Sequence, residues 1–275
     1  MPYNNECMQA TEIEASMSIE SCNRPTQGRV LEDFANCNGS PQVSRYVESK
    51  ATVDCLVALI MLAISWPLIL TLMALVRLTS RGPALYKQVR LGLDGRPYLI
   101  LKLRTMVHDC ERATGPQWAK ARDPRATLLG RILRATHLDE LPQLWNVVRG
   151  EMSLVGPRPE RPEFVRQLEG VIPNYRERLR VRPGITGLAQ VQLPPDEDVD
   201  GVARKVAYDV YYVERINLWL DLRILIGTAL KMAGNSYGCI RLLVALPRPE
   251  VVLGKVPEEG LKPEMALRDF VTTAG

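Results

Sequence analysis

Two adjacent carboxylates, Asp139 and Glu140, lie in the segment THLDELPQLWN at residues 136–146, just before a proline and an amphipathic run. One interpretation is structural. With Asp139 as the N-cap, Glu140 and Leu141 form the first helical turn, and Pro142 falls where a missing N–H costs little. Acidic side chains there also complement the helix dipole. The other interpretation is chemical, because neighbouring carboxylates can bind a divalent metal or attack phosphorus.

Basic side chains recur on both sides of this acidic pair. Arg134 precedes it by a few residues, Lys102 and Arg104 alternate along one predicted strand, and Arg158 stands in the stiff segment GPRPERP. Two cations on a strand often mark a solvated face, but cations beside a helix N-terminus also bind phosphate. So many cations exceed what two carboxylates need for charge balance. The set indicates phosphate chemistry in which Mg²⁺ and arginine neutralise phosphate oxygens while a carboxylate attacks phosphorus.

A long apolar segment lies upstream of these residues. Residues 55–76 contain no charged side chain over 22 positions, which at about 1.5 Å per residue is enough to cross a bilayer core. Pro67 removes one helical hydrogen bond near the middle, and the Ser65 hydroxyl is placed to compensate the loosened backbone. The pattern leaves two topologies open: a kinked helix that spans the membrane, or a bent helix whose two ends emerge on the same side.

Composition narrows the classes of function. The net charge is +4, but residues 1–49 hold three Arg against seven Asp or Glu, so the positive charge lies further along the chain. A basic body can meet anionic lipid, nucleic acid or phosphorylated small molecules. The six cysteines show no CxxC spacing and there are only two histidines, which argues against zinc and Ser-His-Asp sites. Basic and aromatic residues are not interleaved, so we expect no nucleic-acid partner.

The sequence also predicts the secondary-structure elements that position the acidic pair. Asp94-Gly95 is a strong turn signal between two strand-like runs and predicts a β-hairpin. Helical periodicity dominates the rest, and residues 163–180 are predicted to form one basic helix. The predicted fold class is α+β: a mostly helical, membrane-associated domain with a small hairpin and a Pro-broken membrane helix. The predicted organisation is a polar, disordered leader at 1–45, the membrane helix at 46–79, a catalytic domain at 80–235 and a C-terminal extension at 236–275.

Three segments in this order resemble the bacterial sugar transferases, the monotopic phosphoglycosyl transferases. They are GPALYKQVRLGLDGRPYLILKLRTM, LGRILRATHLDELPQLWNVVRGEMSLVGPRPE and VRPGITGLAQV, and they follow a Pro-broken apolar helix. The resemblance covers about Lys50 to Lys231. It implies transfer of a sugar 1-phosphate from a nucleotide diphosphate sugar, usually a UDP-sugar, to undecaprenyl phosphate, with release of UMP.

The resemblance also implies roles for individual residues. Asp139 is the expected nucleophile of a covalent phosphosugar intermediate in a ping-pong mechanism, and Glu140 is expected to help hold Mg²⁺. Arg134 belongs to the expected phosphate-handling set, and Lys102, Arg104 and Arg158 match basic positions of the family motifs.

In the family, the apolar helix is re-entrant and bent at a Ser-Pro pair. Here Pro67 matches the proline, while Ser65 stands one place further from it, because Trp66 intervenes. A re-entrant helix places the site at the cytoplasmic face of the bacterial inner membrane, where membrane lipid, a soluble nucleotide sugar and the lipid phosphate all have access.

Two alternatives stay open at this point: a membrane-bound nucleotide-sugar pyrophosphatase, and a non-enzymatic scaffold anchored to the membrane. A homo-oligomer is compatible with the sequence. No residue identifies the sugar or the polysaccharide pathway.

Overall fold

The computed structural model describes residues 41–110, 123–194 and 199–253. The chain divides into two compact units, 1–46 and 47–275, and the contacts discussed below lie within the second. Its strands are β1 (Leu85–Leu91), β2 (Pro97–Leu103), β3 (Ser153–Val155) and β4 (Gly184–Thr186), and its 3₁₀ helices are η1 (Leu93–Gly95), η2 (Leu138–Glu140) and η3 (Tyr175–Arg180). The α-helices are α3 (Pro41–Thr79), which begins in the first unit, and then α4 (Leu128–Ala135), α5 (Gln143–Val148), α6 (Pro162–Leu168), α7 (Leu188–Gln192), α8 (Val199–Arg215), α9 (Leu218–Met232), α10 (Tyr237–Leu243) and α11 (Pro249–Leu253).

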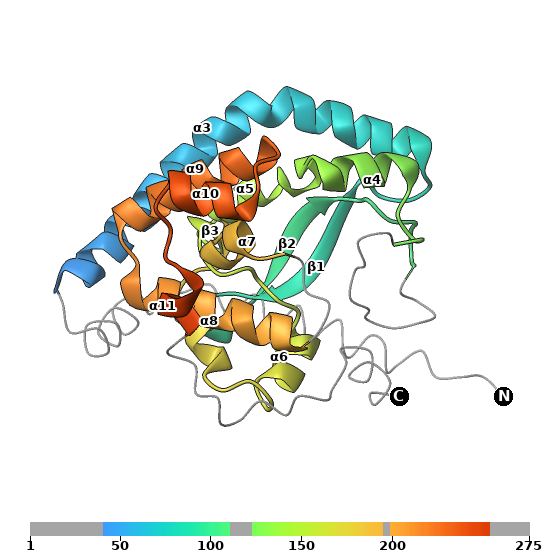
Figure 1. Cartoon of the computed structure of the whole chain (residues 1–275). Helices are drawn as coiled ribbons and strands as arrows, with labels where there is room; N and C mark the ends of the chain where they lie inside the picture. Colours follow the sequence, from blue (N-terminus) through green and yellow to red (C-terminus); the bar gives the residue numbers. More distant parts are fainter. Residues whose placement is uncertain (1–40, 111–122, 195–198, 254–275) are drawn as a thin grey trace. The chain divides into compact units, whose positions relative to one another are not determined.

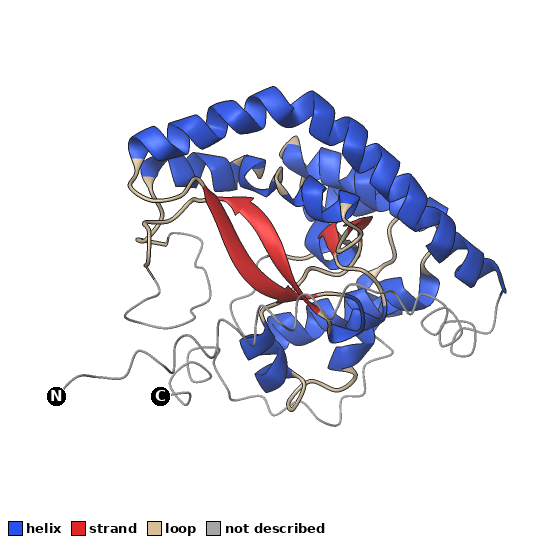
Figure 2. Ribbon diagram, turned by 180° about the vertical axis from the view of Figure 1, so that it is seen from behind, coloured by secondary structure: helices blue, strands red, loops and turns tan. Residues whose placement is uncertain are grey.

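The predicted β-hairpin is confirmed. Strands β1 and β2 pair antiparallel, from Leu85 opposite Leu103 to Leu91 opposite Pro97. Asp94 and Gly95 both adopt positive φ angles, +56° and +74°, which is why this dipeptide turns the chain here. Figure 2 shows the hairpin as a long twisted ribbon among helices. The second sheet is a short parallel pair of β3 and β4.

Helix α3 runs without interruption through Pro67 and is visibly bent (Figure 1). The Ser65 hydroxyl donates to the carbonyl oxygens of Met61, at 2.7 Å, and of Leu62, at 3.4 Å. It does not reach Ala63, whose carbonyl is the one that Pro67 leaves without a backbone donor. The Ser65 hydroxyl therefore bonds nearby carbonyls and not the carbonyl of Ala63 that it was expected to compensate.

One narrow stripe of α3 packs against the rest of the domain. The residues of this stripe recur at intervals of three, four or seven positions, as one helix face requires: Ala58, Leu62, Ile69, Leu72 and Val76. Large apolar side chains on the other faces stay exposed, among them Ile64 at 76% and Leu78 at 82%. Residues 46–79 are long and apolar enough to cross a membrane, and an 18-residue window within them has a mean hydropathy of 2.5.

Both ends of α3 are fastened to the same body. Near its start, the Lys50 ammonium lies 2.6 Å from Asp221 of α9 and 3.2 Å from Asp54. Asp54 in turn accepts a hydrogen bond from Ser153 of β3. Lys50 is therefore buried in an ion-pair network, although it lies only a few residues before the uncharged run of α3. Near the other end, Leu72 and Val76 belong to a core cluster with β2 and α4.

The predicted fold class is confirmed in its coarse form: small sheets in a mostly helical domain with one long apolar helix. A helix predicted over residues 163–180 is wrong, since α6 ends at Leu168 and η3 follows. Gly170 and Pro173 interrupt the run, and Asn174 takes a left-handed conformation at φ +57°.

The structure describes the outer segments only in part. Helix α3 begins at Pro41, inside the range assigned to the leader, and residues 1–40 lie outside the described residues. Within the predicted C-terminal extension, α10 and α11 bury Ile240 and Val252 against the domain. The rest of that extension, residues 254–275, is not described.

Candidate active site

Asp139 and Glu140 lie in the short 3₁₀ helix η2, not at the mouth of an α-helix. His137 precedes η2 in a left-handed conformation, and α5 begins only at Gln143, with Pro142 at its N-cap position and no capping side chain. The predicted N-cap role of Asp139 is therefore wrong. The turn is fixed by hydrophobic packing, because Leu138 contacts the core cluster that joins α3, β2 and α4.

Glu140 is held by two cations from distant parts of the chain. Its Oε1 atom accepts hydrogen bonds from Lys102 Nζ at 2.8 Å and from Arg158 Nη2 at 3.1 Å. Burial raises the pKa of Glu140, but the charges of Arg158 and Lys102 outweigh burial and hold the pKa well below its usual value. Glu140 is thus a fixed anion. Lys102 and Arg158 both lie beside the pair of adjacent carboxylates, Asp139 and Glu140, which we call the dyad.

Asp139 differs from its neighbour, because within the described residues no hydrogen bond or ion pair reaches its carboxylate. Burial and the adjacent charge of Glu140 raise the pKa of Asp139, while Lys102, Arg134 and His137 act in the opposite direction. The residue is only 7% exposed, yet its oxygens are not sealed from solvent. A carboxylate whose oxygen lone pairs are not used in hydrogen bonds, and which lies among cations, suits a nucleophile or a metal ligand.

The remaining predicted cations, Arg134 and Arg104, are positioned by other residues. Arg134 donates from Nε to the Thr105 hydroxyl at 2.8 Å, and its charge still bears on Asp139. Arg104 donates from Nη2 to the carbonyl oxygen of Ser80 at 2.9 Å and to its hydroxyl at 2.8 Å. Arg104 was grouped with Lys102 on one strand face, but its guanidinium is directed to the end of α3 and makes no recorded bond to the dyad.

A close approach between α4 and the strand end makes the Arg134 contact possible. Helix α4 begins with the Thr127 hydroxyl accepting from Gly130 N at 2.9 Å. A side chain at Gly130 would collide with the carbonyl of Thr105, so only glycine allows α4 to lie this near. The approach sets Arg134 against Thr105 and thereby toward Asp139.

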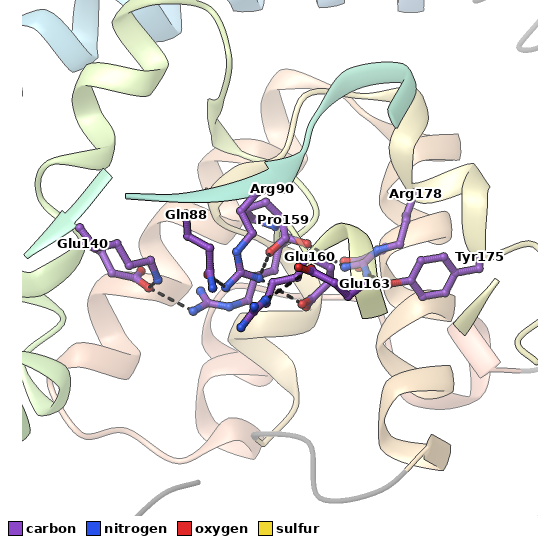
Figure 3. Close-up of polar contacts among 12 residues, drawn as sticks. Gln88, Arg90, Glu140, Pro159, Glu160, Glu163, Tyr175 and Arg178 are labelled. Atoms are coloured by element: carbon purple, nitrogen blue, oxygen red, sulfur yellow. Dashed lines mark hydrogen bonds and ion pairs between the residues drawn. The ribbon is translucent and has the colours of Figure 1, made fainter. Parts of the chain in front are cut away.

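Hydrogen bonds and ion pairs extend from Glu140 past Arg90 to Arg178 and Tyr175 (Figure 3). Arg178 donates to the backbone carbonyl of Arg158 at 2.9 Å and to the Tyr175 hydroxyl, also at 2.9 Å. It also pairs with Asp209 at 2.7 Å. Arg90 donates to the carbonyl of Pro159 at 3.1 Å. These contacts stiffen the loop that carries Arg158.

Sequence reasoning missed Arg90 and Arg178 as parts of this arrangement. The sequence did hold a signal for Arg90, because it stands two residues after Gln88 and so shares a strand face with it. In the structure the two side chains are hydrogen-bonded at 2.7 Å. The partner of Arg178 in this arrangement, Asp209, lies in α8.

The dyad can be tested as a site for Mg²⁺. No cluster of three or more His, Cys, Asp or Glu side chains that would hold a metal by itself occurs among the described residues. In phosphate-transfer sites, however, Mg²⁺ is usually held by one or two carboxylates together with substrate phosphates and water. The unbonded carboxylate of Asp139 and the second oxygen of Glu140 provide such hard donors, so the residues fit a shared metal.

Comparison with known proteins agrees with the motifs. The sequence profile of the family described as "Bacterial sugar transferase" matches residues 45–235, more than half of the chain. The chain belongs to the bacterial sugar transferase family. It is therefore an enzyme of the transferase class, and the resemblance inferred from the motifs is confirmed.

Individual relatives are similar over the same region. A UDP-glucose:undecaprenyl-phosphate glucose-1-phosphate transferase of Caulobacter vibrioides is 44% identical over 194 residues, which cover 68% of this chain and 72% of the relative. A UDP-N-acetylgalactosamine-undecaprenyl-phosphate N-acetylgalactosaminephosphotransferase of Aeromonas hydrophila is 41% identical over 213 residues, 76% of this chain but 50% of that protein. An exopolysaccharide production protein of Sinorhizobium fredii is 37% identical over 205 residues, 69% of this chain and 88% of the relative.

Proposed function

We propose that this transferase moves a sugar 1-phosphate from a UDP-sugar to undecaprenyl phosphate, releasing UMP, as the first step in building a cell-surface polysaccharide. The observation that carries the proposal is the contrast within the dyad: Glu140 is bonded to two cations, while Asp139 has no bonded partner. The names of the relatives supply the substrate classes.

In the first half-reaction, a carboxylate oxygen of Asp139 attacks the sugar-bearing phosphorus of the donor. The bond from that phosphorus to the bridging oxygen breaks, and UMP leaves with the electron pair. Lys102, Arg134 and Arg158 lower the repulsion between the anionic nucleophile and the diphosphate. When bound at the dyad, Mg²⁺ would supply further neutralisation of phosphate charge, with Glu140 as its main protein ligand.

In the second half-reaction, a phosphate oxygen of the lipid attacks the same phosphorus. The bond between Asp139 and phosphorus breaks, the carboxylate is regenerated, and the product is a lipid diphosphate sugar. UMP leaves before the lipid reacts, so the two substrates can use one nucleophile in turn, which is a ping-pong mechanism.

The way α3 is attached supports a proposal for its placement in the membrane. Lys50 binds α9 at one end of the helix, and Leu72 and Val76 pack on β2 and α4 near the other. A helix that crossed the bilayer would carry one of these ends away from the catalytic body. We therefore propose that α3 is re-entrant and lies in the cytoplasmic leaflet of the inner membrane, with its exposed apolar faces in lipid.

The test is incubation of the purified protein with UDP-sugars, followed by UMP measurement and mass analysis of peptides. With donor alone, the wild type should release about one UMP per enzyme and gain a sugar-phosphate mass on the peptide that contains Asp139. Asp139→Asn should show neither, while Asp200→Asn, an exposed aspartate in the first turn of α8, should behave as wild type. A mass gain on another residue would disprove the assignment, and phosphosugar released to water despite added lipid phosphate would indicate a pyrophosphatase.

A further inference from the structure

Two groups of cations lie near the dyad, one toward α6 and the other toward the end of α3. The first, which we call the α6-side group, consists of Arg90, Arg158 and Arg178. Arg90 and Arg178 donate to carbonyls of the loop before α6, and Arg158, which belongs to this loop, bonds Glu140 of the dyad. The second, the α3-end group, consists of Arg77 and Arg104 beside the turn that follows α3. Figures 1 and 2 both show α6 and α3 on opposite sides of the hairpin.

Arg104 has unused hydrogen-bonding capacity. It is 6% exposed, and its Nη2 atom binds Ser80, but its Nε and Nη1 atoms are buried without a partner among the described residues. Buried guanidinium donors are costly to leave unpaired. Arg77 lies close by, donating to the carbonyl of Gly82 at 3.3 Å, and no carboxylate in the described part of the chain pairs with either arginine.

Electrostatics support the same view of the α3-end group. Burial and the neighbouring positive charge of Arg77 lower the pKa of Arg104. Two like charges held together without a counter-ion indicate that an anion belongs between them.

The α3-end group is close to the dyad. Arg104 follows Lys102 by two residues, a step of roughly 7 Å along a strand, and Lys102 bonds Glu140. The next residue, Thr105, bonds Arg134, whose charge acts on Asp139. A phosphate held by Arg104 therefore lies within reach of a phosphorus atom attached to the nucleophile.

The surroundings of the α3-end group are apolar and exposed. Leu75 and Leu78 of α3 are 42% and 82% exposed, and Leu128 and Ile132 of α4 are 76% and 56% exposed. Leu72 and Val76, on the buried face of α3, pack with Leu133 of α4, so the two helices lie side by side here. An anion at this place would have apolar surface beside it, as the headgroup of a prenyl lipid requires.

We propose that Arg104 and Arg77 bind the phosphate monoester of the lipid acceptor, and that Arg158 of the α6-side group serves the nucleotide diphosphate donor. The lipid chain then runs over the exposed leucines of α3 and α4, while the donor enters from the side of α6. This assignment rests on the proposed function, since it divides the two substrates of that reaction between the two groups.

The His108 ring lies near the Arg104 guanidinium. A side chain at Gly82 would collide with both the Arg104 Nη1 atom and the His108 ring, so these two groups meet over the glycine. The His108 side chain is 45% exposed and pairs with Asp109 at 3.1 Å.

The two half-reactions allow a direct test. Arg77→Gln and Arg104→Gln should keep the wild-type burst of UMP and the covalent adduct with donor alone, but should raise the KM for polyprenyl phosphate at least tenfold. Arg158→Gln should instead weaken the burst. The matched control is Arg81→Gln, which removes an exposed charge from the same turn and should change the acceptor KM less than twofold. Because Arg77 is exposed, its variant stays informative even if Arg104→Gln fails to fold.

A second acceptor separates phosphate recognition from membrane binding. A water-soluble short-chain alkyl phosphate carries the same headgroup, so both variants should discharge the adduct to it at least tenfold more slowly than wild type. A defect seen only with polyprenyl phosphate in vesicles would mean that the arginines bind the membrane surface, and a reduced UMP burst would place them on the donor side; either result overturns the proposal. If the wild type itself forms no adduct, the proposed function fails instead.

Discussion

Replacing Lys50 by alanine is expected to loosen the attachment of α3 to the catalytic body. The Lys50 ammonium pairs with two buried carboxylates, Asp221 at 2.6 Å and Asp54 at 3.2 Å. Removing one partner from a buried ion pair leaves uncompensated charge and typically costs about 3–5 kcal/mol. Tyr212 and Ser153 continue to donate to these carboxylates, at 2.8 Å for Tyr212 to Asp221, so the lower end of that range is expected.

The assay is thermal unfolding of the detergent-solubilised protein, followed by circular dichroism. For a domain of this size, 1 kcal/mol shifts the midpoint by roughly 2–4 °C, so Lys50→Ala should lower it by roughly 6–12 °C. The control is Arg149→Ala, which breaks an ion pair to Glu151 in which the arginine side chain is 55% exposed. Exposed pairs contribute about 0–1 kcal/mol, so that variant should shift the midpoint by no more than about 4 °C.

A double-mutant cycle with Asp221→Asn isolates the pair. If Lys50 and Asp221 stabilise the protein through each other, the loss in the double variant should be smaller than the sum of the two single losses. Equal shifts for Lys50→Ala and Arg149→Ala, or strictly additive effects in the cycle, would refute the claim that this ion pair fastens α3.

Three other predictions follow from the site and from α3. Glu140→Gln should lower the rate of UMP release roughly 100-fold and move the Mg²⁺ titration to higher concentration, and an unchanged titration would refute the ligand role. Gly130→Ala should push α4 away from Thr105 and lower both the unfolding midpoint and the rate of adduct formation; retention of both would show that the approach is not needed. In a variant without native cysteines, Thr52→Cys and Thr79→Cys should both react with an impermeant thiol reagent from the cytoplasmic side, and labelling from opposite sides would establish a spanning helix.

Much of the fold could be predicted because its signals are local. Asp94-Gly95 favours positive φ and so predicts the hairpin, and an uncharged run of 22 residues predicts one long apolar helix. The interpretation of residues 163–180 as one helix failed because it gave more weight to the helical periodicity than to Gly170 and Pro173, which end the helix in the structure. The N-cap predicted for Asp139 failed because packing of Leu138 favours a separate 3₁₀ turn.

The sequence by itself determined the chemical inventory of the site: two adjacent carboxylates, several cations and a Pro-broken apolar helix. Only the tertiary structure decided how these groups are paired. Lys102 meets Glu140 across 38 residues of chain and Lys50 meets Asp221 across 171, and no short-range pattern encodes such contacts. Folding therefore made one carboxylate a fixed anion and left its neighbour free, because the position of each cation depends on packing between distant elements rather than on local preference.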